Sequence, residues 1–325
     1  MSVCVFLGGF GFGNLGDEAC LETSFKLYRL ETNCAFTVNP VVTGKVGSFD
    51  LFFRDIKELF DHYPRIDRVV IAGGGVGFNP SFKDNLDWAL RCKTRGAEVV
   101  VHNIGIGKIG NEWALAWPYL VPVLAEAKSF SVRDFRSKAE VESWDLGLSP
   151  EVSFYPERNL EVRETLREHL PVSGEFIGVS INNRPELWDV IKDNRDALRQ
   201  IFASFRGSSI VPVVSTIHEF DSAEHDNVGF ARFVDFLGIA DRVVFPQACD
   251  RDFWLGNIGP SDIKYVISRC RLLVSARKHN IIHAIGARVP FIGVFEFNND
   301  SIPRVFQTLF NELPHGSSLY PLYPS

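Results

Sequence analysis

An alternation of short β-branched runs with longer amphipathic stretches starts at the N-terminus and constrains the fold more than any other feature of the sequence. The first half of the chain predicts strands at Val3–Leu7, Cys34–Val38, Arg68–Ala72, Glu98–Asn103, Ser129–Val132 and Val152–Tyr155. Helical patterns lie between them, at Asp17–Leu30, Leu51–Phe60, Phe82–Arg95 and Phe135–Trp144. Repeated units of a strand and a helix predict a parallel sheet covered by helices.

This rhythm stops at a polar segment, Glu157–Glu175, which holds Pro171 and Gly174 and is the candidate domain linker. A second series of strands is predicted at Phe176–Ile181, Ile210–Val214, Arg242–Phe245, Leu272–Ser275 and Phe291–Val294. A chain of 325 residues suits two domains of ordinary size. We therefore expect an α/β protein with two doubly wound, Rossmann-like domains, residues 1–165 and 166–325, and ligand sites beyond the carboxyl ends of the strands.

Composition and net charge indicate which class of protein the sequence encodes and which kinds of partner are disfavoured. Hydrophobic residues at 46% and charged residues at 23% are typical of a globular protein. Val3–Leu7 follows no basic residue and precedes a glycine turn, which predicts a strand rather than a signal peptide, and no apolar stretch approaches the ~20 residues that span a bilayer. Six cysteines without C-x-x-C pairs favour a reducing, cytoplasmic location. A net charge of -6 argues against nucleic acid or anionic lipid as a partner, so an anionic substrate must meet a local basic site.

The segment Gly11-Phe12-Gly13-Asn14-Leu15-Gly16 has the G-x-G-x-x-G spacing of a dinucleotide-binding turn. Such a site also needs an acidic residue near the end of the second strand, where this chain has Thr37-Val38-Asn39-Pro40. Asp17 and Glu18 place negative charge where a pyrophosphate would bind. We therefore expect no nicotinamide or flavin here. The glycines either line a substrate cleft or only permit close packing of helix and strand, with Asp17 as a helix cap.

Two more strands of the first half end in glycines, within "IAGGGVGF" at residues 71–78 and "HNIGIGKIG" at residues 102–110. Glycine lets a ligand approach the backbone closely, and the exposed N–H groups of such turns can bind an anion. Three glycine turns after parallel strands in one domain, including Gly74, Gly75 and Gly105, predict a substrate cleft.

Two junctions between a strand and a helix carry cationic side chains. Arg133 and Asp134 follow the fifth predicted strand, where they form either a surface ion pair with a helix cap or part of a site. In the second half, Arg277, Lys278 and His279 stand together at the start of a helix, where positive charge opposes the helix dipole. We expect something anionic to compensate these three side chains.

His279 and His283 lie one helical turn apart, which is the spacing of a two-histidine metal site. No glutamate follows His279 and no third ligand is evident in the sequence, so no metal is expected. His283 is predicted to pack in the inner face of its helix.

Together these segments resemble the polysaccharide pyruvyl transferase family, whose members move a pyruvyl group from phosphoenolpyruvate onto a sugar as a cyclic ketal. The matching features span nearly the whole chain and are, in order, Gly11–Glu18, Gly73–Gly75, Gly105–Gly107, Ser131–Asp134, and Arg277 with His279. The resemblance implies two Rossmann-like domains similar to the glycosyltransferase B-type arrangement. The first domain would be the acceptor side and the second the donor side.

Three positions depart from the family pattern. Lys278 stands where the family has an apolar residue, Phe295–Asn299 lacks the lysine of a Tyr-Asp-x-Lys setting, and Tyr155-Pro156-Glu157 replaces an Asp-Pro pair. Two alternatives therefore stay open. One is a glycosyltransferase that uses a nucleotide sugar, with Glu296 as the acid that binds the ribose, and the other is a catalytically inactive sugar-binding or assembly protein of the same fold.

The implied reaction needs a proton for the methylene carbon of the donor, attack by a sugar hydroxyl on the central carbon, and loss of phosphate. Arg133 and Arg277 suit the phosphate and carboxylate of the donor, and they would come from opposite domains. His279 is the candidate acid or base, and Asp17 would orient or deprotonate the acceptor hydroxyl.

The residues expected to bind substrate are Gly13, Asn14, Gly16, Gly74, Gly75, Gly105 and Lys278. Lys278 would substitute for the family's downstream lysine. The resemblance implies no cofactor besides phosphoenolpyruvate as the donor substrate. The implied acceptor is a sugar, a lipid-linked saccharide or a glycan, as in exopolysaccharide or cell-envelope biosynthesis.

Overall fold

The computed structural model describes residues 1–76, 82–107, 117–170, 176–296, 299 and 301–322. The chain divides into two compact units: a first unit of residues 1–12 and 17–157, and a second unit of residues 13–16 and 158–325. The predicted boundary lies at residue 165, whereas this division falls after Glu157 and assigns four residues of the first glycine loop to the second unit. Pro171 and Gly174 of the predicted linker lie outside the described residues.

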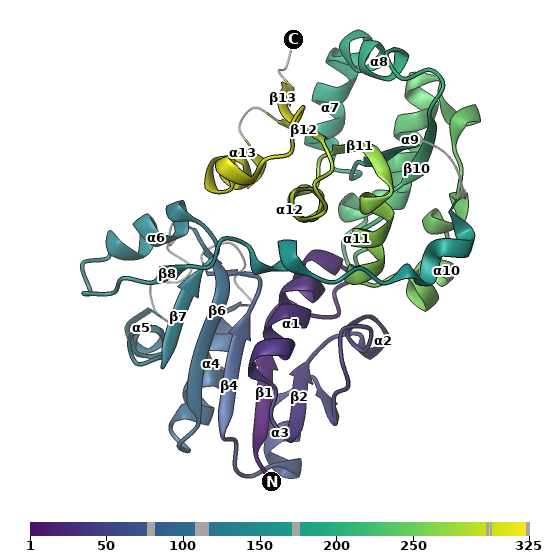
Figure 1. Ribbon diagram of the computed structural model, residues 1–325. Helices are drawn as coiled ribbons and strands as arrows, with labels where there is room; N and C mark the ends of the chain where they lie inside the picture. The colour runs from purple at the N-terminus through teal and green to yellow at the C-terminus, as the bar shows by residue number, and fades with distance from the viewer. Residues whose placement is uncertain (77–81, 108–116, 171–175, 297–298, 300, 323–325) are drawn as a thin grey trace. The chain divides into compact units, whose positions relative to one another are not determined.

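The first unit is built on a parallel sheet with the strand order β3-β2-β1-β4-β6-β7-β8, and β5 pairs with β6 (Figure 1). The strands are β1 (Val3–Leu7), β2 (Thr32–Phe36), β3 (Leu51–Phe53), β4 (Arg68–Ala72), β5 (Gly75–Val76), β6 (Glu98–Ile106), β7 (Ser129–Val132) and β8 (Glu151–Val152). The helices are α1 (Leu15–Tyr28), α2 (Pro40–Thr43), α3 (Ile56–His62), α4 (Phe82–Lys93), α5 (Trp117–Ala125) and α6 (Phe135–Glu142). Neighbours of β1 on its two sides are β2 and β4, so the order of the strands reverses at β1.

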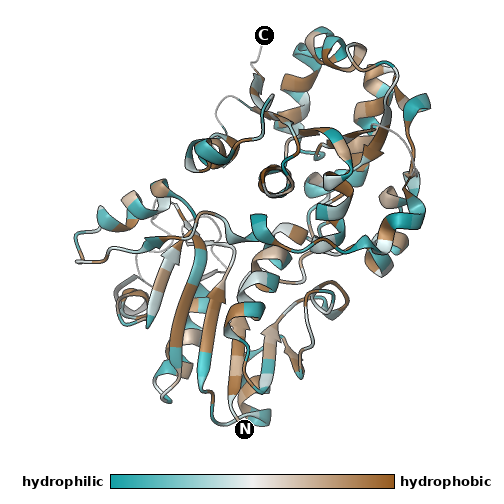
Figure 2. Ribbon diagram, in the orientation of Figure 1, coloured by the Kyte–Doolittle hydropathy of each residue, from teal (hydrophilic) through white to brown (hydrophobic). Residues whose placement is uncertain are grey.

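Both faces of this sheet are covered, which explains why its strands are continuous apolar runs. Val3, Val5 and Leu7 of β1 pack into one cluster with buried residues of α3, α4, α5 and α6. Cys4 and Phe6 point to the other face and pack with residues of α1. Figure 2 shows these strands mainly in the brown of hydrophobic residues.

The second unit is built on a smaller parallel sheet with the order β10-β9-β11-β12-β13. Its strands are β9 (Phe176–Ser180), β10 (Ser209–Pro212), β11 (Cys270–Ser275), β12 (Phe291–Glu296) and β13 (Ser318–Leu322). Its helices are α7 (Pro185–Asp193), α8 (Arg195–Ala203), α9 (Asp226–Leu237), α10 (Arg251–Asn257), α11 (Pro260–Ser268), α12 (Lys278–Ala287) and α13 (Ser301–Thr308). The predicted α/β class with two doubly wound parallel sheets is confirmed. None of the described helices is long and apolar enough to cross a membrane.

Two predicted elements differ from the structure inside the units. Leu51–Phe60 was expected to be one helix, but Leu51–Phe53 pairs with β2 as a strand, and α3 begins only after Asp55, whose carboxylate accepts a hydrogen bond from the N–H of Lys57. Arg242–Phe245 is not a strand. Of its residues only Val243 forms a bridge, to Ile210, because the chain turns at Phe245, which has a φ of 59°.

At the two sheet edges the predictions also differ from the structure. The predicted strand Val152–Tyr155 is reduced to β8, since Phe154 and Tyr155 both have a left-handed backbone, with φ of 55° and 54°. At the other end of the chain, β13 was not predicted, and it pairs with β12 from Ile292 opposite Ser318 onward.

Two glycines in the last turns of two helices of the second unit predict opposite effects of the same substitution. A Cβ on Gly286 of α12 would overlap the carbonyl oxygen of Arg158, whereas a Cβ on Gly256 of α10 would have no neighbour within 4 Å. Alanine in a helix is favoured over glycine by about 0.5–1 kcal/mol. Gly256→Ala should therefore raise the free energy of unfolding by up to that amount, and Gly286→Ala should lower it by about 1–3 kcal/mol because the backbones must move apart. Denaturant unfolding of both variants measures this, and equal gains in the two variants would contradict the packing of α12 on Arg158.

Candidate functional site

A pocket of 240 Å³ lies in the first unit at the carboxyl ends of β1 and β4, where the strand order reverses. Parallel α/β sheets bind their ligands at such a point. The pocket is lined by Gly8, Gly9, Phe12, Asp17, Phe36, Arg54, Gly74, Gly75, Asp84, Asn85 and Trp88. Of the residues predicted to bind substrate or act in catalysis, Asp17, Gly74 and Gly75 line this pocket, whereas Gly13, Asn14, Gly16 and Gly105 do not. Residues 77–78 of the second turn and 108–110 of the third lie outside the described residues.

Gly105, predicted from the sequence to lie in a third glycine turn, is instead part of β6, which extends to Ile106 rather than ending at Asn103, and it lies against Arg133 of the first unit. A Cβ on Gly105 would overlap the guanidinium of Arg133, so this side chain lies directly against the backbone of β6. The N–H of Gly105 donates to the carbonyl of Gly74 at 3.1 Å, which joins β6 to the second glycine turn. Three predicted site residues therefore lie together at the carboxyl edge of the first sheet.

Asp134 acts as the predicted cap of α6 and also fixes its surroundings. Its carboxylate accepts hydrogen bonds from the N–H of Ser137 at 2.7 Å and from the hydroxyl of Tyr155 at 3.0 Å, and Arg133 lies 3.6 Å away. Burial opposes ionisation of Asp134, but Arg133 and the hydrogen bonds outweigh it and lower its pKa. The ion pair thus holds Arg133 as well as the helix start.

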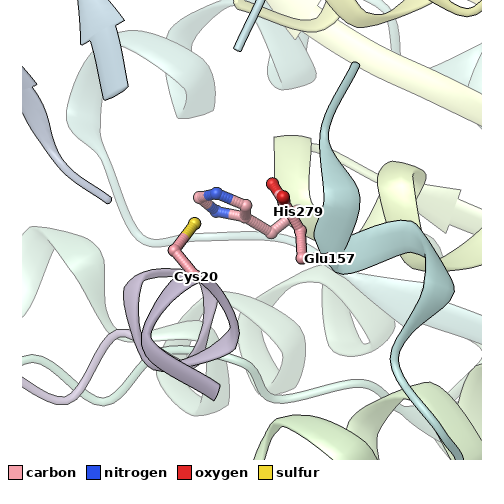
Figure 3. A group of neighbouring side chains, drawn as sticks. All are labelled: Cys20, Glu157 and His279. Atoms are coloured by element: carbon pink, nitrogen blue, oxygen red, sulfur yellow. The ribbon is translucent and has the colours of Figure 1, made fainter. Parts of the chain in front are cut away.

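Glu157 is a buried carboxylate of the first unit that the sequence analysis did not assign. Its side chain is fully buried and accepts a hydrogen bond from the amide of Asn103 at 2.8 Å. The same amide lies 3.6 Å from the sulfur of Cys20, and the amide oxygen of Asn103 accepts from the hydroxyl of Ser153. Figure 3 labels Cys20 and Glu157. Asn103 has a φ of 55°, so a left-handed residue inside β6 holds this group together. The only hint in the sequence is the departure Tyr155-Pro156-Glu157.

The second half of the first glycine loop packs within the second unit. Ile217 donates its N–H to the carbonyl of Gly13 at 3.0 Å, and Leu15 donates to the carbonyl of Ser215 at 2.9 Å. Gly13 has a φ of 83°, and a Cβ there would overlap the carbonyl of Ile217. Asn14 caps the start of α1, since its side-chain oxygen accepts from the N–H of Gly16 at 3.0 Å. Gly13 and Asn14 therefore serve the packing of this loop.

Gly16 and His279 are brought into contact in the second unit. A Cβ on Gly16 would overlap the imidazole of His279, so the ring lies directly against the backbone of the loop. His279 belongs to the first turn of α12 and is half-buried, as is Lys278; its imidazole is labelled in Figure 3. The structure therefore unites two residues that the sequence analysis selected from opposite ends of the chain. His283, one turn later, is buried as predicted.

Arg277 lies at the N-terminus of α12 and is held by two acidic residues. Its Nε donates to Asp226 at 2.6 Å, Nη1 to the carboxylate of Glu224, and Nη2 to the carbonyl of Glu224 at 2.6 Å. Burial alone would lower the pKa of Arg277, but Asp226 and Glu224 outweigh it and raise the pKa, so Arg277 stays charged. The expected anionic compensation is thus supplied by the protein itself. A guanidinium has five N–H donors, and these bonds to described residues use three of them.

Asp226 connects Arg277 to the glycine loop. Its second carboxylate oxygen accepts from the N–H and the hydroxyl of Ser215 and from the N–H of Thr216, each at 3.0 Å. The carbonyl of Ser215 then accepts from Leu15 in the loop. Asp226 and Glu224 were not predicted as site residues, although both follow a predicted strand of a parallel sheet, which is where functional side chains were expected.

The residue proposed for a nucleotide-sugar site, Glu296, ends β12 and is half-buried, and burial raises its pKa. Phe297 and Asn298, where the family's downstream lysine was sought, lie outside the described residues.

Glu18, which bonds the first glycine loop, makes the stability of the fold depend on pH. Its carboxyl is fully buried in α1, accepts a hydrogen bond from the N–H of Gly11 at 2.6 Å, and has a pKa raised by burial to about 8. Between the ordinary value of 4.5 and about 8, the folded protein holds a proton that the unfolded chain has lost, so stability falls as pH rises through this window.

We expect the free energy of unfolding to fall by up to about 1.4 kcal/mol per pH unit across this window because of Glu18. Glu18→Gln should remove this slope, since glutamine resembles the protonated acid and can still accept from Gly11. Unfolding measured from pH 5 to 9 checks the prediction. Parallel curves for the wild type and Glu18→Gln would show that Glu18 is ionised in the folded protein.

Comparison with known proteins supports the fold. The chain is similar to the UDP-GlcNAc 2-epimerase of Methanocaldococcus jannaschii, with a TM-score of 0.61 and 9% identity over 99% of this chain and 89% of that one. It is also similar to the UDP-GlcNAc 2-epimerase of Neisseria meningitidis bound to UDP-GlcNAc, with a TM-score of 0.52 and 10% identity over 94% of this chain and 85% of that one. At such low identity the likeness shows the fold alone, which is the glycosyltransferase B type.

Sequence similarity identifies the family. No curated protein matches the chain in sequence. The family model described as polysaccharide pyruvyl transferase matches residues 14–295, from the first glycine loop to β12. This match covers most of the 325 residues and includes the turns that carry Gly74, Gly105, Arg133 and Arg277. The chain therefore belongs to the polysaccharide pyruvyl transferase family.

Proposed function

We propose that the protein transfers the pyruvyl group of phosphoenolpyruvate to two hydroxyls of a sugar or glycan and forms a cyclic ketal. Membership of the family supports this class of transferase. The observation that carries the proposal is the turn after β11, which places a charged arginine, a lysine and a histidine at one helix start, with the histidine against the first glycine loop. Cationic groups beside a titratable one suit a substrate that carries a phosphate and a carboxylate and must receive a proton.

The donor would be bound by arginine and lysine side chains. The guanidinium of Arg277 suits a carboxylate or phosphate, and its ion pairs with Asp226 and Glu224 hold it in a defined position. Lys278 follows it in the chain and adds an ammonium that can reach a phosphate. Arg133, beside Gly105, is the candidate cation of the first unit. No cofactor is part of the proposal.

The chemical step would use His279 and Asp17. His279 gives a proton to the methylene carbon while a sugar hydroxyl oxygen bonds to the central carbon of the donor, and Asp17 orients this hydroxyl and takes its proton. Phosphate then leaves with cleavage of its bond to the central carbon. A second hydroxyl of the same sugar then bonds to that carbon and gives its proton to the departing phosphate, which closes the ketal ring. Asp17 lines the pocket of the first unit, where an acceptor hydroxyl can reach it.

Incubation of the protein with phosphoenolpyruvate and a panel of sugars tests the proposed function. We expect release of one phosphate per ketal formed, measured by phosphate assay and by mass spectrometry of the sugar, whose mass rises by one pyruvate less one water. UDP-N-acetylglucosamine serves as the competing donor, because a structural neighbour binds it. Transfer from the nucleotide sugar without phosphate release from phosphoenolpyruvate would refute the proposal in favour of a glycosyltransferase.

His279 and Arg277 should differ in which step they affect. His279→Gln is expected to lower turnover by about 10² to 10⁴ while the dissociation constant of the donor changes little, because general acid–base catalysis is typically worth that factor. Arg277→Lys should weaken donor binding by about 10-fold or more, since lysine keeps the charge but loses the planar fork. Lysine is preferred to methionine because a neutral residue would leave Asp226 buried without a cation, which destabilises the fold.

Calorimetry with phosphoenolpyruvate, together with turnover at saturating donor, separates the two effects. His62→Gln is the control, since His62 ends α3 on the surface and should change neither quantity. If His279→Gln loses donor binding but keeps its turnover at saturation, His279 is a binding group and not the proton donor.

A further inference from the structure

The pocket at the carboxyl ends of β1 and β4 has the size, walls and charge of a site for one uncharged sugar ring. We propose that it binds a single neutral pyranose of the acceptor and excludes the donor. This inference rests on the proposed function and names the substrate class of its acceptor site. It is built from residues of the first unit alone.

The volume limits the occupant. Pockets for drug-sized ligands measure about 300–1,000 Å³, and this one measures 240 Å³. One pyranose ring fits such a space, whereas a disaccharide or a nucleotide sugar would extend beyond it. The pocket therefore selects a terminal sugar residue, with the remainder of the acceptor outside.

Aromatic side chains form one wall. The ring of Trp88 lies 5.2 Å from that of Phe36 at an interplanar angle of 74°, and 6.2 Å from that of Phe53. This packing fixes the orientation of the half-buried Trp88, while Phe12 lines the pocket from the glycine loop. The C–H groups on one face of a pyranose are apolar and pack well on such rings, which provide contact area at little cost in side-chain entropy.

The charged groups exclude the donor. Among the described residues that line the pocket, two carry negative charge, Asp17 and Asp84, and one carries positive charge, Arg54. Arg54 is also tied to the backbone, since its Nη2 donates to the carbonyl of Val38 at 2.9 Å. A net negative pocket repels phosphoenolpyruvate, and its carboxylates accept hydrogen bonds from sugar hydroxyls. The same charge disfavours an acidic sugar.

Gly9 keeps the space in front of Asp17 open. A Cβ on Gly9 would lie 3.8 Å from the Oδ2 of Asp17, with no closer described atom outside the neighbouring residues of the chain, so the fold has room for this Cβ beside the carboxylate. Gly8 differs, because a Cβ there would overlap the carbonyl of Ala72. Gly9 is thus the position at which the pocket can be filled without unfolding the protein.

Ligand-observed NMR with the full chain and no donor tests the proposal. The probes are methyl pyranosides of glucose, galactose, mannose and N-acetylglucosamine, with methyl glucuronide as the acidic probe. We expect at least one neutral pyranoside to bind, phosphoenolpyruvate not to displace it, and the glucuronide to bind at least 10-fold more weakly. Gly9→Val should weaken binding by at least 10-fold, and Asp84→Asn by about 10-fold through loss of a charged hydrogen bond.

Two controls accompany these variants. Gly207→Val introduces the same side chain in the second unit, where a Cβ would have no neighbour within 4 Å, and should leave binding unchanged. The melting temperature of Gly9→Val should equal that of the wild type, which separates a filled pocket from a damaged fold.

The outcomes separate a failure of the proposed sugar pocket from a failure of the proposed transferase function. The pocket proposal fails if no pyranoside binds, if phosphoenolpyruvate or the glucuronide competes equally well, or if Gly9→Val binds like the wild type. If Gly9→Val binds normally while phosphate release persists, the pocket is wrong and the proposed function stands. If pyranoside binding is lost in Gly9→Val but the wild type never releases phosphate from phosphoenolpyruvate, the pocket stands and the proposed function fails.

Discussion

The buried carboxylate of Asp226 is the interaction on which the arrangement of the second unit depends. One of its oxygens receives Arg277, and the other receives three donors from Ser215 and Thr216. A buried ion is tolerated only when its lone pairs are satisfied, and here four hydrogen bonds meet that condition. The same residues then position the start of α12 and the glycine loop, so the geometry around His279 follows from a group that need not touch a substrate.

The fold could be predicted from the sequence because its main signal is local. Alternating strands and helices require a parallel sheet in each half, and both sheets are present. The errors arose where local signals compete. Leu51–Phe53 fits a helical pattern with the residues after it, and only pairing with β2 makes it a strand. The run at Arg242–Phe245 is as apolar as a strand, but the left-handed Phe245 redirects the chain.

The candidate site could be predicted only in part. Arg133, Arg277 and His279 were found because each stands where a strand meets a helix, and Gly16 because glycines mark turns. Their contacts could not be predicted, since the overlap of Gly16 with His279 and of Gly105 with Arg133 depends on tertiary packing. Asp226, Glu224 and Glu157 belong to no sequence motif. Their role is seen only in the structure, where Glu224 bonds the guanidinium of Arg277 and Glu157 bonds the amide of Asn103, because buried polar groups need hydrogen-bond partners.

The assignment of Gly13–Gly16 to the second unit has a consequence for the exchange of domains between relatives. The backbone passes between the two units after residues 12, 16 and 157, so one crossover point does not separate them. A chimera joined only after Glu157 would combine the glycine loop of one relative with the Ser215–Ile217 segment of another. The hydrogen bonds between loop and segment, and the close contact of the loop with His279, would then depend on residues from two different proteins. A domain exchange that keeps the second unit intact must therefore transfer residues 13–16 together with residues 158–325.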